Sequence, residues 1–457
     1  MKSLSLYIGT LLLLLIGCTP DDEVISTDPS FRLAFSADTV FFDTLFTTKE
    51  DEGIDMRSVT QRFTVYNSSE NAVNISEISL NDPNSVYSIL VNGQREEIIN
   101  NTLLRGGDSM LVLTEANVPY QDENDVRELN ADISFFTNGT RQSVQLNAFA
   151  EDPLYISGGA ILVGNVTWQK GRPYVITDSL YVSENSTLTA EAGTRIIFDN
   201  EAKIAVSGSL QLLGTPQDTI RLESIRLDGQ YENAPGQWDG LFFDSLSKNN
   251  IIHGALIRNA RVGILMYHND NDDVIDLDIE GTTIRNMSQV GVAITNADVR
   301  IVNTIISHTL SYAYAHASGG KCDFLYNTVV NSNTGFFREN PSVAFESTNE
   351  PIELNMINNI IWGNLSNEIV ITEGVNNSIT NNILKTISDQ YDPENNLINI
   401  DPYFKSPYTY NFDLADDSPA RSAGIDINGI TIDQRGNERL SPPDIGALQW
   451  IQETDSE

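Results

Sequence analysis

A motif made of asparagine, a second polar residue and two apolar residues recurs through the second half of the chain. Clear copies are NTII at 303–306, NTVV at 327–330, NNII at 358–361 and NNIL at 381–384, with weaker copies ALIR at 255–258 and TTIR at 282–285. Successive copies therefore begin 27, 21, 24, 31 and 23 residues apart. Spacings in this range indicate a solenoid or another repeat array, in which neighbouring repeats bury one another's apolar residues.

The repeats are rich in β-branched residues and are bounded by Asn, Gly and Ser, so they predict short strands joined by turns. We therefore predict a right-handed parallel β-helix whose coils begin near Val182. The recurring asparagines are expected to stack, each amide bonding to the coils above and below. A β-propeller is the alternative, but its four-stranded blades need a steadier period of about 40 residues or more.

Residues 31–150 show a different pattern, in which apolar and polar residues often alternate. Examples are FRLAF at 31–35, RFTVY at 62–66 and VQLNA at 144–148. This alternation predicts half-buried strands, and Asn138-Gly139 between two such runs predicts a tight hairpin. About 120 residues of short strands favour an immunoglobulin-like β-sandwich.

The N-terminus has the features of an export signal. Lys2 supplies a positive charge, residues 6–16 are mainly apolar, and Gly17 precedes Cys18. The apolar run is too short for a membrane-spanning helix of about 20 residues, and it fits a cleaved signal peptide. The ending LIGC at 15–18 resembles the lipobox of bacterial lipoproteins, which implies cleavage before Cys18 and lipidation of its thiol. An ordinary signal with an incidental cysteine is the alternative.

Only two cysteines are present, so a lipidated Cys18 would leave Cys322 without a disulfide partner. We expect Cys322 to be a small buried residue rather than a nucleophile.

Acidic residues dominate the composition. The chain has 63 Asp and Glu against 27 Lys and Arg, a formal net charge of −36. Such a charge disfavours nucleic acid as a partner, and the sequence contains no Lys/Arg run to override it. Asp21-Asp22-Glu23, just after Cys18, resembles the acidic export tag of Bacteroidetes surface lipoproteins. The resemblance implies an outer-membrane protein that faces the cell exterior, with the lipid bilayer as a partner; a merely solvated linker is the simpler interpretation.

The C-terminal region closes with DQRGNER at 433–439 and PDIGA at 443–447. This ending is similar to the last segment of many secreted bacterial β-helix proteins, and we expect it to cap the open end of the stack, with Arg439 paired to Asp444. Together with the lipobox and the sandwich, it resembles a family of Bacteroidetes lipoproteins with right-handed β-helix repeats. The resemblance implies an architecture and no particular reaction. The expected organisation is a signal peptide (1–17), an acidic linker (18–30), the sandwich (31–152), the β-helix with its capping segment (153–450) and a tail (451–457).

Enzyme motifs known from β-helix proteins are missing from the sequence. Glycosidases usually need two carboxylates at a defined separation, and polysaccharide lyases commonly need an Arg or Lys base with a cation. His253 has no paired carboxylates nearby in the sequence, and the Asn-Thr pairs of the repeats lack the acid that a polygalacturonase-like pattern requires.

Two groups of residues are nevertheless candidates for binding. Arg258 and Arg285 occupy equivalent places in adjacent repeats and, with Arg261, could form a basic face for an anionic sugar. Trp238 and Asp239 lie in the polar segment GQWDG, where the indole could stack on a sugar ring. The competing interpretations are an arginine ladder matched by carboxylates and a tryptophan that packs in the core.

One acidic stretch is a candidate metal site. HNDNDD at 268–273 offers hard oxygen ligands, and Asp270, Asp272 and Asp273 suit Ca²⁺, although the spacing is not that of an EF-hand. A solvated acidic turn is the alternative.

The sequence therefore predicts a non-catalytic surface lipoprotein that uses a β-helix as a rigid surface for a glycan, for adhesion or for an outer-membrane protein complex. The alternative is an extracellular polysaccharide lyase or glycoside hydrolase of β-helix fold.

Overall fold

The computed structural model describes residues 23–49, 53–54, 60–82, 85–227, 229–267, 274–332, 337–348 and 350–452. The chain divides into two compact units, Met1–Asp152 and Pro153–Glu457. The division falls at the same place as the boundary expected from the sequence. Cys18 and most of its acidic neighbours lie outside the described residues, so the lipidation stays a prediction.

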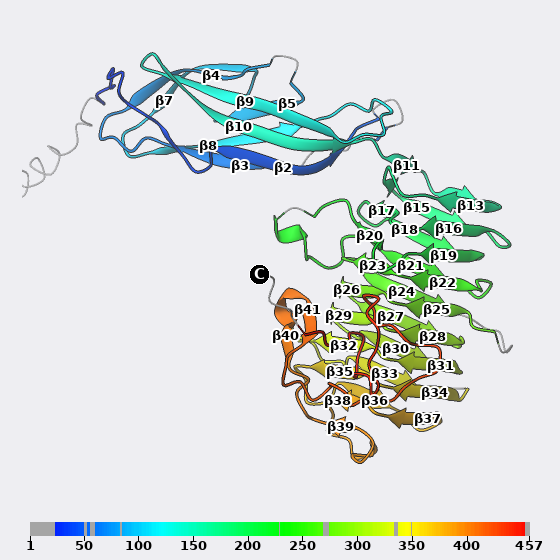
Figure 1. Cartoon of the computed structure of the whole chain (residues 1–457). Helices are drawn as coiled ribbons and strands as arrows, with labels where there is room; N and C mark the ends of the chain where they lie inside the picture. Colours follow the sequence, from blue (N-terminus) through cyan, green and yellow to red (C-terminus); the bar gives the residue numbers. More distant parts are fainter. Residues whose placement is uncertain are drawn as a thin grey trace, which may run out of the picture. The chain divides into compact units, whose positions relative to one another are not determined.

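The first unit is a sandwich of two five-stranded sheets (Figure 1). One sheet has the order β1 (Ala34–Phe35), β3 (Gln61–Tyr66), β8 (Ser109–Ala116), β5 (Tyr87–Val91) and β6 (Gln94–Arg95). The other has the order β2 (Thr39–Phe46), β10 (Thr140–Glu151), β9 (Arg127–Thr137), β4 (Val73–Leu80) and β7 (Ile98–Leu104). Only the β2–β10 pair is parallel among these strands. The predicted sandwich is confirmed.

The predicted hairpin is also present. Strands β9 and β10 pair antiparallel, with Thr137 opposite Thr140, so the loop between them has two residues. Asn138 and Gly139 both have positive φ, 51° and 78°. This is the arrangement of a type I′ turn, whose twist matches that of the flanking strands and which favours Asn-Gly.

The second unit is a parallel β-helix, which confirms the predicted fold class. Three long sheets, called here sheets 1, 2 and 3, contain only parallel pairs, and each coil contributes one strand to each sheet over most of the stack (Figure 1). Sheet 1 consists of β11 (Leu154–Ile156), β14 (Tyr174–Ile176), β17 (Arg195–Phe198), β20 (Ile220–Ser224), β23 (Ala255–Arg258), β26 (Thr283–Met287), β29 (Ile305–Thr309), β32 (Thr328–Asn331), β35 (Ile360–Gly363), β38 (Ile383–Leu384) and β39 (Leu397–Ile398).

Sheets 2 and 3 have nine strands each. Sheet 2 consists of β12 (Ala160–Leu162), β15 (Ser179–Val182), β18 (Lys203–Val206), β21 (Gly240–Phe243), β24 (Val262–Tyr267), β27 (Val290–Thr295), β30 (Tyr314–Ala317), β33 (Val343–Glu346) and β36 (Ile369–Ile371). Sheet 3 consists of β13 (Asn165–Trp168), β16 (Thr187–Glu191), β19 (Ser209–Leu213), β22 (Asn250–His253), β25 (Leu277–Glu280), β28 (Val299–Val302), β31 (Gly320–Leu325), β34 (Ile352–Ile357) and β37 (Val375–Thr380). The stack thus begins near residue 154, earlier than the expected start at Val182.

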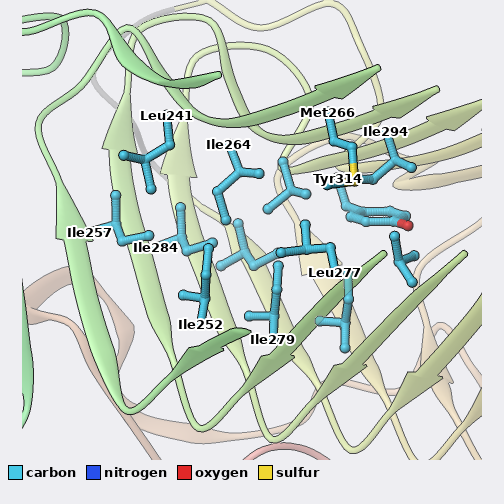
Figure 2. Close-up of a cluster of buried hydrophobic side chains, with 14 of the residues drawn as sticks. Leu241, Ile252, Ile257, Ile264, Met266, Leu277, Ile279, Ile284, Ile294 and Tyr314 are labelled. Atoms are coloured by element: carbon cyan, nitrogen blue, oxygen red, sulfur yellow. The ribbon is translucent and has the colours of Figure 1, made fainter. Parts of the chain in front are cut away.

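Aligned apolar residues fill the interior of the stack. In sheet 1, one inward column contains Ile257, Ile284 and Ile306 on successive strands, and all three are fully buried. Figure 2 shows this packing, with Ile257 and Ile284 from sheet 1, Leu241 and Ile264 from sheet 2, and Ile252 and Ile279 from sheet 3 turned toward one another. Because each coil leaves its apolar residues exposed until the next coil covers them, the stack is stable only as an array.

The expected asparagine ladder is present inside the stack. The Asn359 side-chain amide donates to Asn382 Oδ1 (2.9 Å) and to the Phe324 carbonyl (2.7 Å), and its Oδ1 accepts from the backbone and side chain of Asn327 (2.8 and 3.1 Å). Asn382 in turn donates to Asn396 Oδ1 (3.0 Å). Every link joins two coils, so the ladder satisfies buried polar groups while holding the register.

The register corrects the alignment of the repeats. Ile305 pairs with Thr328, and Thr328 with Ile360, so Asn327 is equivalent to Thr304 and Asn359 rather than to Asn303 and Asn358. In the NTII and NNII copies, the first asparagine is instead a left-handed residue, with φ of 49° at Asn303 and 61° at Asn358. Its side chain bonds outside the coil, to the main chain of the C-terminal segment.

That segment does not lie where we expected it. It runs along the side of the stack: Gln434 donates to the Thr282 carbonyl (2.9 Å), Asn303 to the Ile432 carbonyl (2.9 Å) and Asn358 to the Ile425 carbonyl (2.7 Å). At the last coils, the side chain that packs into the interior is instead that of Tyr391. It comes from the chain between β38 and β39 and is buried with Ile371 and Leu384. The expectation of a terminal cap was wrong because the first asparagines hold the segment along the coils.

Arg439 makes its expected contact only with the main chain of Asp444 (3.4 Å). Its guanidinium also donates to Asn303 Oδ1 (2.7 Å) and lies over the Tyr326 ring, 3.9 Å from the ring centre. The Asp444 carboxylate accepts from the backbone N–H groups of Ser422 (2.7 Å) and Trp450 (2.6 Å). Both residues are therefore structural.

Candidate functional site

Trp238 is part of the core. Its side chain is fully buried, its ring stacks on Phe198 with 3.9 Å between centroids, and its Nε1 donates to the Arg258 carbonyl (2.8 Å). The structure contradicts the candidate role of this indole in stacking on a sugar and supports the competing interpretation, a tryptophan that packs in the core. Polar neighbours in the sequence did not reveal that the segment folds back against the stack, where Trp238 bridges Ala260.

Asp239 and Arg261 form a surface ion pair. Arg261 Nη1 lies 2.8 Å from Asp239 Oδ1, and the side chains are 49% and 18% exposed. An exposed pair of this kind contributes little to stability. It also neutralises the charge that was expected to attract an anionic sugar.

Arg258 and Arg285 do stack on adjacent strands, as predicted, because they are direct partners in the β23–β26 register. Their surroundings differ. The guanidinium of Arg258 contacts Glu223 through Nε (2.8 Å) and Nη2 (2.7 Å), with both side chains less than a tenth exposed. The basic face is therefore matched by a carboxylate at Arg258.

Arg285 has no such partner among the residues that the structure describes. Its guanidinium lies over the ring of Tyr410, 4.0 Å from the centroid, and its buried Nε makes no hydrogen bond. Burial lowers the pKa of Arg285, and the nearby charge of Arg258 lowers it further. Tyr410 opposes this shift, and so, more weakly, do Glu232 and Glu223. A partly buried cation that no described carboxylate contacts directly is costly, so this position needs an explanation.

Other buried polar atoms without partners lie next to Arg285. They are Oδ1 of Asn259, Oγ of Ser307 and Nδ1 of His308. Ser307 pairs with Arg285 in the register of β26 and β29. Asn259, which follows β23, and His308, within β29, are both left-handed, with φ of 69° and 54°. We call Asn259, Arg285, Ser307 and His308 the Arg285 site. Buried polar groups are normally bonded, so a cluster of unbonded ones indicates a place for a polar ligand or water.

Two segments flank the Arg285 site. The loop that carries the 3-10 turn η2 (Gly229–Tyr231) is held by Asn259, whose amide donates to the carbonyls of Glu232 (2.9 Å) and Ala234 (3.0 Å). On the other side is the C-terminal hairpin of β40 (Phe404–Ser406) and β41 (Asn411–Leu414), which contains η3 (Pro407–Thr409). Figure 1 shows both segments beside the strands of sheet 1.

Tyr410 follows η3 in this hairpin and positions the hairpin against the Arg285 site. Its hydroxyl donates to Asn286 Oδ1 (3.0 Å), and its ring lies 4.5 Å from that of His308. Burial, and secondarily the charge of Arg285, lowers the pKa of His308 to about 4, so the imidazole is neutral at pH 7. Sequence reasoning found the two arginines by their repeat position. It missed Tyr410 and His308, because nothing local in the sequence indicates a contact with residues more than a hundred positions away.

A second charged cluster lies on sheet 3. His253 Nε2 is 3.1 Å from Asp278 Oδ2, and one potential ligand atom each from His253, Asp278 and Glu280 lies within 4.8 Å of the others. Arg300 Nη1 contacts Asp278 (2.8 Å) and Glu280 (2.6 Å). Burial opposes the ionisation of Asp278, but hydrogen bonds from His253 and Arg300 outweigh it and lower its pKa. The structure thus gives His253 the carboxylate neighbours that its local sequence lacks, one coil away.

The remaining predictions concern calcium and cysteine. Asp270, Asp272 and Asp273 lie outside the described residues, so the calcium site stays a prediction. Cys322 is buried inside the stack, 3.3 Å from the Tyr314 hydroxyl, and burial raises its pKa to about 12. A thiol that stays protonated is not a nucleophile, so the expectation of a structural cysteine is confirmed.

No protein-family model and no curated protein sequence matches the chain. Among solved structures, the catalytic domain of Agl-KA is 11% identical, with a TM-score of 0.21 over 79% of this chain and 89% of that one. The catalytic domain of a GH87 alpha-1,3-glucanase in complex with tetrasaccharides is 9% identical, with a TM-score of 0.19 over 74% and 91%.

A protein of unknown function from Porphyromonas gingivalis is 11% identical, with a TM-score of 0.19 over 30% of this chain. The chain spans 58% of the length of that protein. Likenesses this weak do not extend to function. In the described part of the chain, no helix is long and apolar enough to cross a membrane.

Proposed function

We propose that this protein is a non-catalytic glycan-binding lipoprotein of the cell surface, with the Arg285 site as its binding site. The observation that supports the proposal is the clustering of unbonded, buried polar atoms from Arg285 and Ser307, on adjacent strands, and from Asn259, which directly follows β23. A sugar carries hydroxyls that both donate and accept hydrogen bonds, so it can satisfy such a mixed group. The strands that carry these side chains are held by the stack, which makes the site rigid.

The pairing of Glu223 with Arg258 favours binding over hydrolysis at this site. Glycoside hydrolysis uses two carboxyl groups on either side of the scissile bond. Glu223 is the carboxylate that contacts the arginine column, and both its position and its charge are taken up by Arg258.

The anchor is the second part of the proposal. We infer from LIGC at 15–18 and from Asp21-Asp22-Glu23 that Cys18 is lipidated and that the protein faces the cell exterior on the outer membrane. Several acyl chains on one residue give lasting attachment. Cys18→Ser is expected to move the protein from the membrane fraction to the soluble fraction and to abolish labelling by an alkyne fatty acid. Unchanged fractionation and labelling would contradict the anchor.

Binding is tested with immobilised polysaccharides and the full mature chain. Ser307→Ala removes a buried hydroxyl that has no partner in the structure, so folding should be unaffected, whereas a lost ligand hydrogen bond should weaken retention about tenfold. Ser378→Ala, at an exposed position on β37, is the matched control. Equal retention of wild type and Ser307→Ala on every polysaccharide would place binding elsewhere.

The second candidate function is polysaccharide cleavage. The cluster of His253, Asp278, Glu280 and Arg300 favours it, because a histidine paired with a carboxylate can transfer protons. New reducing or unsaturated ends in the same panel, abolished by His253→Ala, would replace the non-catalytic proposal. Recovery of a stoichiometric outer-membrane protein with the wild-type chain would instead indicate an accessory subunit.

A further inference from the structure

Resting on the glycan-binding function above, we propose that the group held at the Arg285 site is an anion, a carboxylate or a sulfate ester of an acidic glycan. Arg285 would be its counter-ion, Ser307 a second donor, and Asn259 an acceptor for a neighbouring sugar hydroxyl.

The charge of Arg285 is only partly compensated. Glu223 is paired with Arg258, and the closest contact of the Arg285 guanidinium is the Tyr410 ring. Glu232 and Glu223 act on Arg285 more weakly than Tyr410 does. The chain has 63 acidic residues and 27 basic ones, so a directly bonded carboxylate is the ordinary outcome for an arginine here. No described carboxylate makes such a bond to Arg285. A bound anion would supply the missing charge.

The unbonded atoms of the Arg285 site differ in whether they donate or accept hydrogen bonds. Arg285 Nε can only donate, and the Ser307 hydroxyl, which is fully buried and one strand away, has a proton to donate. Two donors side by side match two acceptor oxygens of a carboxylate or sulfate. Asn259 Oδ1 is a carbonyl oxygen and can only accept, while the amide nitrogen of the same side chain donates to the η2 loop. It requires a donor such as a sugar hydroxyl, so the set fits an acidic sugar better than an inorganic anion.

The guanidinium of Arg285 is preorganised for a ligand. The Tyr410 ring covers one face of the Arg285 guanidinium, and the Tyr410 hydroxyl is fixed by Asn286. Asn286 also donates to Asn233 Oδ1 (3.3 Å), which links it to the η2 loop. The guanidinium is therefore held in place by an aromatic face while its Nε stays unbonded. A cation positioned in this way loses little freedom when an anion arrives.

The test measures the affinity of the full mature chain for three sets of oligosaccharides of equal length by calorimetry. One set is neutral, one carries carboxylates (oligogalacturonate) and one carries sulfate esters. We expect Arg285→Met to weaken binding of a charged set at least tenfold. Arg221→Met is the matched control, since Arg221 is an exposed arginine on β20 of the same sheet, and its affinity should stay within twofold of wild type.

The outcomes separate this inference from the proposed function. Preference for the carboxylate or the sulfate set, lost in Arg285→Met, supports the inference and identifies the anion. Binding of the neutral set with equal dependence on Arg285 overturns the anion and leaves glycan binding intact. Binding by Arg285→Met at wild-type affinity overturns the site, and binding of no set by the wild type overturns the proposed function.

The melting temperature distinguishes a ligand-binding role of Arg285 from a purely structural one. If the arginine is kept for a ligand, the unliganded Arg285→Met chain should melt at the same temperature as wild type or higher. Methionine removes a partly buried charge that no described carboxylate contacts directly, and it can still pack on Tyr410. Added acidic ligand should raise the melting temperature of wild type alone. A lower melting temperature for the unliganded variant would overturn the inference.

Discussion

Glu368→Gln is expected to lower the free energy of unfolding of the β-helix by about 3–5 kcal/mol, the cost of leaving one member of a buried ion pair without its partner. Arg338 and Glu368 are 1% and 0% exposed, with Nη2 lying 2.6 and 2.8 Å from the two carboxylate oxygens. Glu368 also accepts from the Ser342 hydroxyl (2.6 Å) and the Leu365 N–H (2.8 Å).

Glutamine keeps the size of Glu368 but not its charge, so Arg338 stays buried and uncompensated. The amide N–H₂ group of the new glutamine is a donor and would also face the donor groups of Arg338 or Ser342. Urea unfolding followed by tryptophan fluorescence measures the loss, because all four tryptophans belong to the second unit. Glu346→Gln, at an exposed position of β33, is the control and should change the free energy by less than about 0.5 kcal/mol. Equal effects of the two substitutions would contradict a compensated pair.

Acid is expected to destabilise the β-helix through His316. Burial lowers the pKa of this histidine to about 4, against the opposing effect of its hydrogen bond to Gly319. Its Nε2 donates to the Gly319 carbonyl (2.8 Å), and its Nδ1 accepts from the Tyr314 hydroxyl (3.0 Å). Both nitrogens of the neutral ring are therefore satisfied inside the stack.

The sign follows from the two pKa values. The unfolded chain binds a proton at His316 as the pH falls through about 6.5, while the folded chain resists until about 4. Between these values the unfolded state holds more protons, so the free energy of unfolding decreases as the pH is lowered. The loss from pH 7 to pH 4.5 is about 2.5 kcal/mol for this residue.

Urea titrations at pH 7 and pH 4.5 measure this loss, and His316→Gln should reduce the difference between them by about that amount, whatever its effect at pH 7. His308, whose pKa is also about 4, should contribute a second part. His308→Asn tests it at little backbone cost, since Asn259 and Asn286 are left-handed residues like His308. The same pH difference in His316→Gln and wild type would show that the charge on His316 is not the cause.

The fold could be predicted from the sequence because each repeat carries its own local signals. The NTVV and NNII copies each indicate a turn and a strand within four residues, and the recurrence of the asparagine predicts that the asparagines stack. The different structural roles of the two adjacent asparagines, Asn358 and Asn359, could not be predicted. Asn358 faces the C-terminal segment and Asn359 the interior, a difference set by the left-handed turn at Asn358.

The candidate site was only half predictable. Arg258 and Arg285 were found because equivalent positions of a solenoid lie one above the other. Their unequal surroundings depend on Glu223, one coil earlier, and on Tyr410, which returns from the C-terminal hairpin. The sequence suggested Trp238 as a ligand platform, and burial against Phe198 excluded it.

By itself, the sequence determined the array: which residues repeat, that they form strands, and that a sandwich precedes them. These properties depend on propensity and periodicity, which act over a few residues. Only the tertiary structure decided which arginine is paired and which is not. Pairing depends on the register between coils and on segments from more than a hundred residues away, such as Tyr410 over Arg285. The energy of a charge is set by what lies within a few ångströms of it, and sequence distance does not report that.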